Sequence, residues 1–391
     1  MSKRRGYFTG LVTGLILALL LISVILMINV GNLGNSIRVF TLIKAKALEP
    51  VQVSQIIDGA MKGMVGELKD PYSIYLQPQE YQALEAHMKG AYGGIGIYVG
   101  IPKDTNKLTV MSPIKGTPAA KAGIKTGDEI RKIDGKDTSE LDIDTAVGMM
   151  KGAAGTEVTL GIKRKGKDEL WNVKLTREII EISSVEGQEL EQYPGIAYIS
   201  ISMFNDLTAK EMQEAIGDLQ SKKKIKGLIL DLRNNPGGSL NAAIDTGSYF
   251  VPKGKPVVWL VDKNRTDPFL STGNLIGLPT VVLINKGSAS ASEILAGAIK
   301  DVKVGTLVGE TSFGKGIVQS VFELKGGAAL KITTAKYLTP NKNDIHKKGI
   351  TPDVAVPFPE GADPAVIYSG NPQQDIQLKK AVEILQEKMK K

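Results

Sequence analysis

An uncharged stretch near the N-terminus constrains the chain most strongly. Residues 7–30 contain no Asp, Glu, Lys or Arg, and three basic residues, 3–5, precede them. A helix over this stretch would be about 36 Å long at about 1.5 Å per residue, more than the roughly 30 Å of a bilayer's hydrocarbon core. A cleaved signal peptide, the alternative, has a shorter apolar region followed by a small-x-small cleavage site. We therefore expect residues 7–30 to form a single transmembrane helix.

The basic residues give this expected anchor a direction. Positive charge stays on the cytoplasmic side, so residues 1–6 form a basic cytoplasmic tip and residues 31–391 face outward. The predicted location is the cell membrane, with one crossing and the rest of the chain extracytoplasmic.

Composition excludes several classes of site. The chain has 391 residues, enough for two or three domains, with no cysteine and two histidines, His87 and His346. Disulfides, a cysteine nucleophile and a histidine-rich metal centre are excluded, and we expect neither cofactor nor metal. The net charge of +8 fits a lysine-rich surface. The densest basic run, 222–224, has no interleaved aromatic residues, which argues against a nucleic-acid partner.

Hydrophobic periodicity divides the chain after residue 30 into four regions. Residues 31–88 are mostly of helical type, 89–177 alternate glycines with short strands, and 359–391 end in a helix. Residues 178–358 alternate strands and helices, which indicates an α/β core. Its apolar strand 228–232 predicts a sheet covered on both faces. The N- and C-terminal helices are candidates for pairing two copies into a homodimer.

The second region contains a candidate peptide-binding loop. Gly94-Ile95-Gly96-Ile97 opens onto a strand, and glycines allow successive backbone N–H groups to point into one concavity. Such a concavity suits a terminal carboxylate, and the adjoining strand edge suits an added strand. With the pattern over 118–135, the region resembles a circularly permuted PDZ domain of the bacterial type. The alternative is a glycine-rich hairpin without a ligand.

A serine-rich segment of the core is the first candidate for catalysis. Residues 285–293 contain Ser288, Ser290 and Ser292 between a buried strand and a helix. A tight turn there holds a nucleophile rigidly while backbone N–H groups face the substrate. The structural alternative is a capping box with Ser290 as the N-cap and Glu293 as its partner.

A glycine–lysine segment is the second candidate. Residues 309–315 match the start of a phosphate-binding loop, but Gly316 stands where Ser or Thr is required. A β-branched, strand-like run follows instead of a helix, so we reject nucleotide binding. Lys315 and Gln319 are four residues apart and lie on roughly the same face of either a strand or a helix.

Together these motifs resemble those of the C-terminal processing, or tail-specific, proteases. The matching segments are 70–73, 231–238, 288–293, 313–319 and 349–353. The resemblance implies an α/β fold: a crotonase-like protease core with an inserted PDZ-like domain, besides the N-terminal helical region and the single transmembrane helix. It also implies Ser290 as nucleophile, Lys315 as base and Gln319 as the residue that orients the base.

The chemistry of the motifs agrees with these roles. A serine hydroxyl needs a base, and neither histidine lies in a comparable motif. A lysine serves as a base only if burial lowers its pKa from about 10.4. An oxyanion needs backbone donors, for which we predict the N–H of Ala291 at the helix start and one from the Gly237-Gly238 pair.

The sequence thus predicts a membrane-anchored serine endopeptidase that recognises free C-terminal tails of protein or peptide substrates and forms an acyl-enzyme. The alternative is a non-catalytic PDZ scaffold at the membrane. A PDZ-bearing protease with a Ser-His-Asp triad fits less well, because the chain lacks a Gly-x-Ser-Gly nucleophile motif and a histidine after a barrel strand. An acyl-CoA-type enzyme fits less well, because the PDZ-like segment and the lysine motif argue against it. Arg177, between the PDZ-like domain and the core, is a candidate regulatory residue; the alternative is a solvated strand residue.

Overall fold

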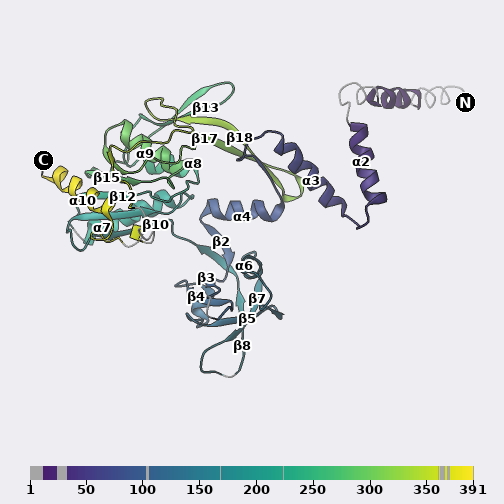
Figure 1. The fold of residues 1–391 in the computed structure, drawn as a ribbon, viewed down its shortest axis with the longest axis horizontal. Coiled ribbons are helices and arrows are strands. Elements are labelled where there is room, and N and C mark those ends of the chain that lie inside the picture. The colour runs from purple at the N-terminus through teal and green to yellow at the C-terminus, as the bar shows by residue number, and fades with distance from the viewer. Residues whose placement is uncertain are drawn as a thin grey trace, which may run out of the picture.

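The computed structural model describes residues 12–23, 33–102, 105–167, 169–222, 224–359, 361, 366–367 and 370–390. A helical N-terminal arm, a small β-rich domain and a larger α/β core follow one another along the chain (Figure 1). The C-terminal helix lies against the core.

The expected transmembrane helix is a wrong prediction. Within the described residues, no helix has both the length and the apolar character that a membrane crossing needs. The part of residues 7–30 that the structure describes is helical from 12 to 23, which spans about 18 Å. The rest of the expected anchor lies outside the described residues. The predicted single-pass location in the cell membrane is therefore corrected together with the helix.

The N-terminal arm contains α2 (Leu33–Lys46), α3 (Val53–Gly66), β1 (Ile74–Leu76) and α4 (Pro78–Lys89). Helix α4 begins with proline in its first turn and ends at Gly90, which has the left-handed backbone that only glycine adopts without strain. Strand β1 was not predicted, because its hydrogen-bond partner is a distant strand of the core rather than a neighbouring segment.

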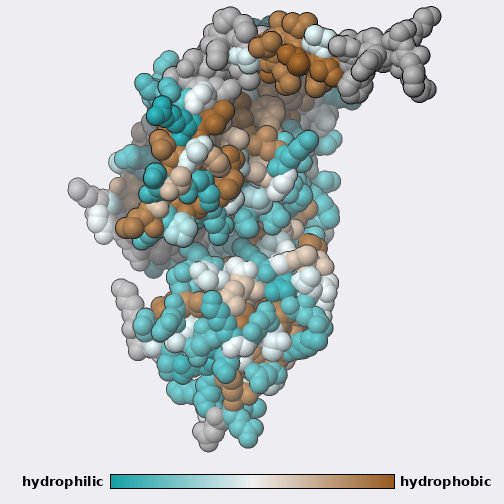
Figure 2. Space-filling view, turned by 90° about the vertical axis from the view of Figure 1, so that its right-hand side faces the viewer, coloured by the Kyte–Doolittle hydropathy of each residue, from teal (hydrophilic) through white to brown (hydrophobic). Residues whose placement is uncertain are grey.

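Helices α2 and α3 expose part of their apolar side chains. Ile37, Leu42, Ile57 and Met64 are among those exposed, and α3 buries none of its residues. Figure 2 shows apolar surface on the side of the molecule that carries this arm. These side chains contribute little to the core of a single chain.

The small β-rich domain is built on alternating side chains. In β8 (Trp171–Thr176), Val173 and Leu175 are buried while Asn172 and Lys174 are exposed, as expected for a strand with one face in a core. The sheet has the strand order β3-β4-β5-β7-β8. Its other strands are β3 (Ile97–Gly100), β4 (Thr109–Pro113), β5 (Glu129–Ile133), β6 (Lys136–Asp137, paired with β5) and β7 (Glu157–Lys163). Its helices are α5 (Pro118–Lys121) and α6 (Ile143–Met150).

A two-stranded ribbon joins this domain to the core. Strand β2 (Ala91–Gly94) enters the domain and β9 (Glu178–Glu181) leaves it, and the two pair antiparallel. Both connections between domain and core therefore run side by side (Figure 1).

The core sheet is covered on both faces, which confirms the expectation drawn from strand 228–232. Its order is β10-β11-β12-β15-β16-β19, parallel except for the β10–β11 pair. The strands are β10 (Val185–Glu189), β11 (Ile196–Ile201), β12 (Gly227–Asp231), β15 (Thr280–Ile284), β16 (Gly305–Gly309) and β19 (Val354–Ala355). Leu228 and Leu230 pack with α7 (Thr208–Lys222), α8 (Leu240–Gly247) and α9 (Ala291–Asp301). Ile229, pointing the other way, packs with α10 (Ile376–Met389).

Helix α10 uses its apolar face inside the molecule. Leu378, Val382 and Leu385 are buried against the sheet, so they are not available for pairing between chains. This corrects the C-terminal half of the expected homodimer contact.

A second sheet extends from the core toward the arm. Its order is β1-β18-β13-β14, with β17 also paired to β18. The strands are β13 (Pro256–Val261), β14 (Thr266–Leu270), β17 (Ile317–Glu323) and β18 (Ala329–Leu338), and η1 (Lys325–Gly327) lies in the β17–β18 turn. The long β17–β18 hairpin reaches α3 and α4 in Figure 1.

Candidate active site

The serine turn joins the buried strand β15 to α9. Ser290 is the N-cap of α9 and has φ 54° and ψ −113°, a conformation that a residue with a Cβ rarely adopts. Strained residues of this kind concentrate at functional sites. The sharp turn leaves Ser290 partly exposed between the buried residues Ala289 and Ala291.

The three serines of this turn differ in what their hydroxyl groups do. Ser288 Oγ donates to Leu232 O at 2.7 Å, and Ser292 Oγ donates to Asn235 O at 2.9 Å; both serines are fully buried. Ser290 Oγ takes part in the capping box, where it faces the backbone N–H of Glu293, but within the described residues it donates no hydrogen bond. Of the three, Ser290 therefore has the hydroxyl that is both accessible and free to donate its proton.

A buried carboxylate connects this turn to the lysine segment. Glu293 Oε2 accepts hydrogen bonds from the N–H groups of Ser290 and Lys315, each at 2.9 Å. Its Oε1 accepts from Ser312 Oγ at 2.6 Å and from Gly314 N at 2.7 Å. The expected capping box is thus part of a larger arrangement in which one carboxylate holds both segments.

The glycines around Lys315 are required by close packing. A Cβ on Gly314, whose φ is 88°, would lie 2.8 Å from Gly349 N. A Cβ on Gly316 would lie 2.8 Å from His346 N. Only glycine admits so close a backbone approach, which fixes the path of the chain on both sides of Lys315.

The amine of Lys315 lies over an aromatic ring from the N-terminal arm. Its Nζ is 4.7 Å from the centroid of the Tyr72 ring. Burial lowers the pKa of Lys315, and the positive charge of Lys331 lowers that pKa further, while Asp70 and Glu293 raise it. The net direction is downward, toward the neutral amine that a general base requires.

Ser290, Lys315 and Gln319 lie in one region but are not joined by hydrogen bonds. All three belong to the described residues, and within these no hydrogen bond links their side chains. Gln319 Nε2 instead donates to Thr333 Oγ1 at 3.1 Å. In this conformation the Lys315 amine lies over the Tyr72 ring and makes no hydrogen bond with Ser290 Oγ.

The loop before the glycine pair is joined to the serine turn. Asn235 O accepts from Ala289 N at 3.0 Å and from Ser292 Oγ at 2.9 Å. A Cβ on Gly237 would lie 2.8 Å from the Cβ of Ser290, so a side chain there would collide with the turn. The absence of a side chain at Gly237 allows this loop to pack directly against the serine turn.

The two glycines differ in the state of their N–H groups. Gly237 N donates to Asn235 Oδ1 at 2.9 Å. A Cβ on Gly238 would lie 2.0 Å from Phe204 O, so this residue also must be glycine. Within the described residues, the N–H groups of Gly238 and Ala291 have no acceptor. This favours Gly238 over Gly237 as the second oxyanion donor.

The predicted peptide-binding loop borders a small cavity of about 30 Å³ between β3 and α6. It is lined by Tyr92, Ile95, Gly96, Ile97, Val147, Met150 and Lys151. Gly94, the fourth predicted residue, lies at the end of β2 and is not part of the lining. The lining is mainly apolar, which suits an apolar C-terminal side chain.

Arg177 is buried, which excludes the interpretation as a solvated residue. Its guanidinium donates to Met149 O at 2.8 Å and to Met150 O at 3.1 Å, at the end of α6. It also donates to Thr156 Oγ1 at 2.9 Å and to Glu157 O at 2.7 Å. Because β9 starts at the next residue, Arg177 connects α6, which lines the small cavity, to the β2–β9 ribbon that leads into the core.

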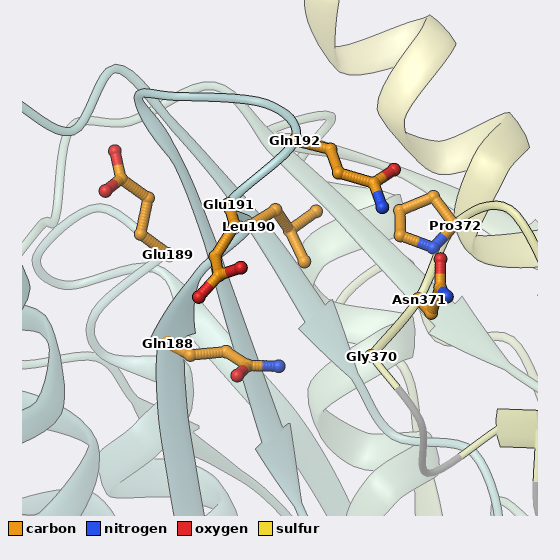
Figure 3. Close-up of a pocket in the computed structure, with 8 residues that line it drawn as sticks. All are labelled: Gln188, Glu189, Leu190, Glu191, Gln192, Gly370, Asn371 and Pro372. Carbon is orange, nitrogen blue, oxygen red and sulfur yellow. The ribbon is translucent and has the colours of Figure 1, made fainter.

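A second cavity, of about 370 Å³, lies between the end of β10 and the segment before α10 (Figure 3). Its lining residues are Gln188, Glu189, Leu190, Glu191, Gln192, Gly370, Asn371 and Pro372. It contains no serine, lysine or histidine, so it offers neither a nucleophile nor a base of the predicted kind.

The sequence did not single out four residues that contact or surround the site. These are Tyr72, Lys331, Thr333 and Tyr337. Tyr337 Oη donates to Ser290 O at 3.0 Å, and burial raises the pKa of that phenol far above its usual value. Only Tyr72 had a signal, as part of the 70–73 motif; the others lie on β18 and reach the site through strand pairing.

Comparison with known proteins identifies related sequences for most of the chain. Residues 195–356 match the model of Peptidase family S41, residues 93–175 that of the PDZ domain, and residues 30–80 that of the Activating protease CtpB N-terminal domain. The chain is 41% identical over 304 residues to a carboxyl-terminal-processing protease of Synechocystis sp., with 77% of this chain and 71% of the relative covered. It is 37% identical over 326 residues to the carboxy-terminal processing protease CtpB of Bacillus subtilis, with 83% and 67% covered. A solved photosystem II D1 C-terminal processing protease is 30% identical, with 88% of this chain and 90% of that chain covered and a TM-score of 0.49.

Proposed function

This chain belongs to the carboxyl-terminal processing proteases of peptidase family S41, serine proteases that here include a PDZ domain, and we propose that Ser290 and Lys315 carry out its peptide-bond hydrolysis. One observation supports the choice of nucleophile above the others. Ser288 and Ser292 use their hydroxyl groups to hold the fold, whereas Ser290 is partly exposed and strained at the start of α9.

The first half of the proposed reaction forms an acyl-enzyme. Neutral Lys315 Nζ takes the proton of Ser290 Oγ as that oxygen attacks the carbonyl carbon of the scissile bond. The carbonyl π electrons move onto the oxygen, which the N–H groups of Ala291 and Gly238 stabilise. When the C=O bond re-forms, the C–N bond breaks and Lys315 gives the proton to the leaving amine.

The second half releases the product. A water molecule attacks the ester carbonyl while Lys315 takes one of its protons. The C–O bond to Ser290 then breaks, and the proton on Lys315 returns to Ser290 Oγ. The peptide leaves with a new carboxyl group, and the amine is neutral again.

This reaction requires Lys315 to move from its resting position. Its Nζ must leave the Tyr72 ring and reach Ser290 Oγ. Gln319 must break its hydrogen bond with Thr333 and form one with the Lys315 amine. A cation–π contact is worth about 1 kcal/mol, so this rearrangement is within the reach of substrate binding.

Substrate tails bind, in this proposal, in the groove between β3 and α6. The backbone from Gly94 to Ile97 receives the free carboxylate, and the apolar lining receives the last side chain. Arg177 transmits binding to the core, because it connects the end of α6 to β9.

Two copies of the chain associate, in this proposal, through the exposed apolar side chains of α2 and α3. A monomeric mass in sedimentation equilibrium would contradict this association.

The nucleophile is tested with a fluorophosphonate probe and a quenched peptide substrate. We expect Ser290→Ala to abolish labelling and to lower kcat by at least about 1,000-fold. Ser292→Ala, the matched control on the same turn, removes a structural hydrogen bond and should keep most of the labelling. Lys315→Ala should also abolish cleavage.

The outcomes separate the roles of these residues. Labelling that survives Ser290→Ala and disappears with Ser292→Ala would show that the wrong serine was chosen. If Lys315→Ala retained more than a few per cent of the activity near neutral pH, Lys315 would not be the base. Thermal unfolding of each variant shows whether a loss of activity reflects a loss of fold.

A further inference from the structure

A second lysine lies beside the proposed base. Lys331 is on β18, where it is paired with Val321 of β17 on one side and with Ile74 of β1 on the other. Its side chain is about half-buried. In the described part of the chain, no carboxylate lies within ion-pair distance of it, although most other buried or half-buried charges have such a partner.

Strand geometry directs Lys331 toward the site. Side chains two residues apart share a face of a strand, so Lys331 points to the same side of β18 as Thr333. Thr333 Oγ1 accepts the hydrogen bond of Gln319, which places this face toward the proposed catalytic residues. The N–H of Thr333 also donates to Ser73 Oγ at 3.1 Å, beside the tyrosine that holds Lys315.

The charges that face Lys315 come from three elements. Lys331 approaches from β18, Glu293 from α9, and Asp70 from the turn before β1. Glu293 already accepts four hydrogen bonds, and Asp70 Oδ2 accepts one from Ser73 Oγ, so both carboxylates are engaged elsewhere. Lys331 is the like charge in this set, and it opposes protonation of its neighbour.

We propose that Lys331 is a positioning residue of the protease reaction, whose ammonium group repels that of Lys315 and so keeps Lys315 available as a neutral base. The inference rests on the proposed role of Lys315. Two close ammonium groups lose the first proton of the pair more readily than an isolated lysine does. Burial of Lys331 reduces the screening of this repulsion by water, and it also lowers the pKa of Lys331 itself.

A charge series at position 331 tests the proposal. The dependence of kcat/KM on pH is measured for wild type, Lys331→Arg, Lys331→Gln and Lys331→Glu with one quenched peptide. We expect the midpoint of the acid limb to rise by about one pH unit in Lys331→Gln, which is about a tenfold loss of kcat/KM below the midpoint. Lys331→Glu should shift it further, and Lys331→Arg should keep the wild-type midpoint.

A lysine on the same strand provides the matched control. Lys336 is paired with Asp344 at 3.1 Å, so Lys336→Gln should leave the midpoint unchanged. A direct readout uses the NMR signal of ¹³C-labelled lysine in the inactive Ser290→Ala protein, with the Lys315 signal assigned from Lys315→Arg. The pKa of Lys315 observed there should rise when Lys331 becomes Gln.

Several outcomes would overturn the inference. One is an unchanged midpoint in Lys331→Gln, and another is the same shift in Lys331→Arg as in Lys331→Gln. A higher KM with an unchanged midpoint would show instead that Lys331 binds an anionic group of the substrate. Activity of Lys315→Ala would refute the proposed function itself, and that result is independent of the Lys331 series.

Discussion

At the scale of single residues, the strain at Ser290 is maintained by its neighbours. Glu293 accepts the N–H of Ser290, and Tyr337 donates to its carbonyl oxygen, so both backbone groups of the strained residue are held. A residue with a Cβ at positive φ costs of order 1–3 kcal/mol. The contacts that offset this cost also present the hydroxyl group to the substrate.

The rate should increase with pH because Lys315 must be neutral to act. Burial and the charge of Lys331 lower its pKa, so the fraction of neutral amine grows as pH rises through that lowered value. We expect kcat/KM, measured from roughly pH 6 to pH 8, to increase with pH and not to fall. A profile that falls over this range, measured with a substrate that does not itself titrate there, would contradict a lysine base.

At the scale of elements, a buried ion network attaches α10 to the loop of the glycine pair. Arg233, at the end of β12, contacts Asp231 through several hydrogen bonds and lies 2.7 Å from Asp375 Oδ2. Asp375 also caps α10 by accepting from the N–H groups of Gln377 and Leu378, each at 3.0 Å. The C-terminal helix is thus connected through one arginine to the residues that precede Gly237.

Replacing Asp375 should destabilise the core far more than replacing a surface charge of the same helix. Asp375→Ala leaves Arg233 short of one partner in a fully buried site, which we expect to lower the free energy of unfolding by about 3 kcal/mol or more. Glu383→Ala, which removes an exposed pair with Lys380, should change it by less than about 1 kcal/mol. Denaturant unfolding measures both, and equal effects of the two variants would contradict the network.

At the scale of the whole molecule, the PDZ domain is connected to the core through the β2–β9 ribbon. Strands β2 and β9 are the entrance and exit of the domain, and Arg177 binds the end of α6 next to β9. The proposed tail site beside Ile95 and Ile97 is lined by Val147 and Met150 of α6. If a tail binds there, α6 and Arg177 provide a short connection from the bound tail to the junction.

Tail binding should activate the protease only when the carboxylate is free. With one peptide prepared as acid and as amide, we expect the wild type to cleave the acid faster. Arg177→Ala and a chain lacking residues 90–176 should lose this difference. To convert a population that is almost entirely inactive into one that is almost entirely active, the tail must bind the active state roughly 10⁴-fold more tightly than the inactive state. A tail with a smaller preference gives partial activation.

Two results would count against this relay. Equal rates for acid and amide in the wild type would refute tail recognition. If Arg177→Ala kept the wild-type difference, the relay would not pass through Arg177 even though tail recognition stood. Lys121→Ala, which removes an exposed pair with Glu178 of β9 at 3.1 Å, serves as the control at the same junction.

Features that depend on local pattern and on motifs could be predicted from the sequence. Alternating glycines and short strands predicted a small β-rich domain before an α/β core. The apolar strand 228–232 predicted a sheet covered on both faces, because a strand that is buried on both faces is apolar at nearly every position. The motifs around Ser290 and Lys315 predicted the family. The length and hydropathy of residues 7–30 predicted a membrane helix, and this prediction is wrong, because no helix within the described residues is long and apolar enough to cross a membrane.

The distant residues that meet at the site could not be predicted from the sequence, because strand pairing in the folded chain brings them together. Pairing of β1, β17 and β18 brings Tyr72 and Lys331 to Lys315, although they are far apart in the chain. The same holds for the proposal of Gly238 rather than Gly237 as oxyanion donor, which rests on the hydrogen bond from the N–H of Gly237 to Asn235 Oδ1. Hydrogen bonds between distant segments leave no pattern in the spacing of neighbouring residues, so these partners could not be predicted from the sequence.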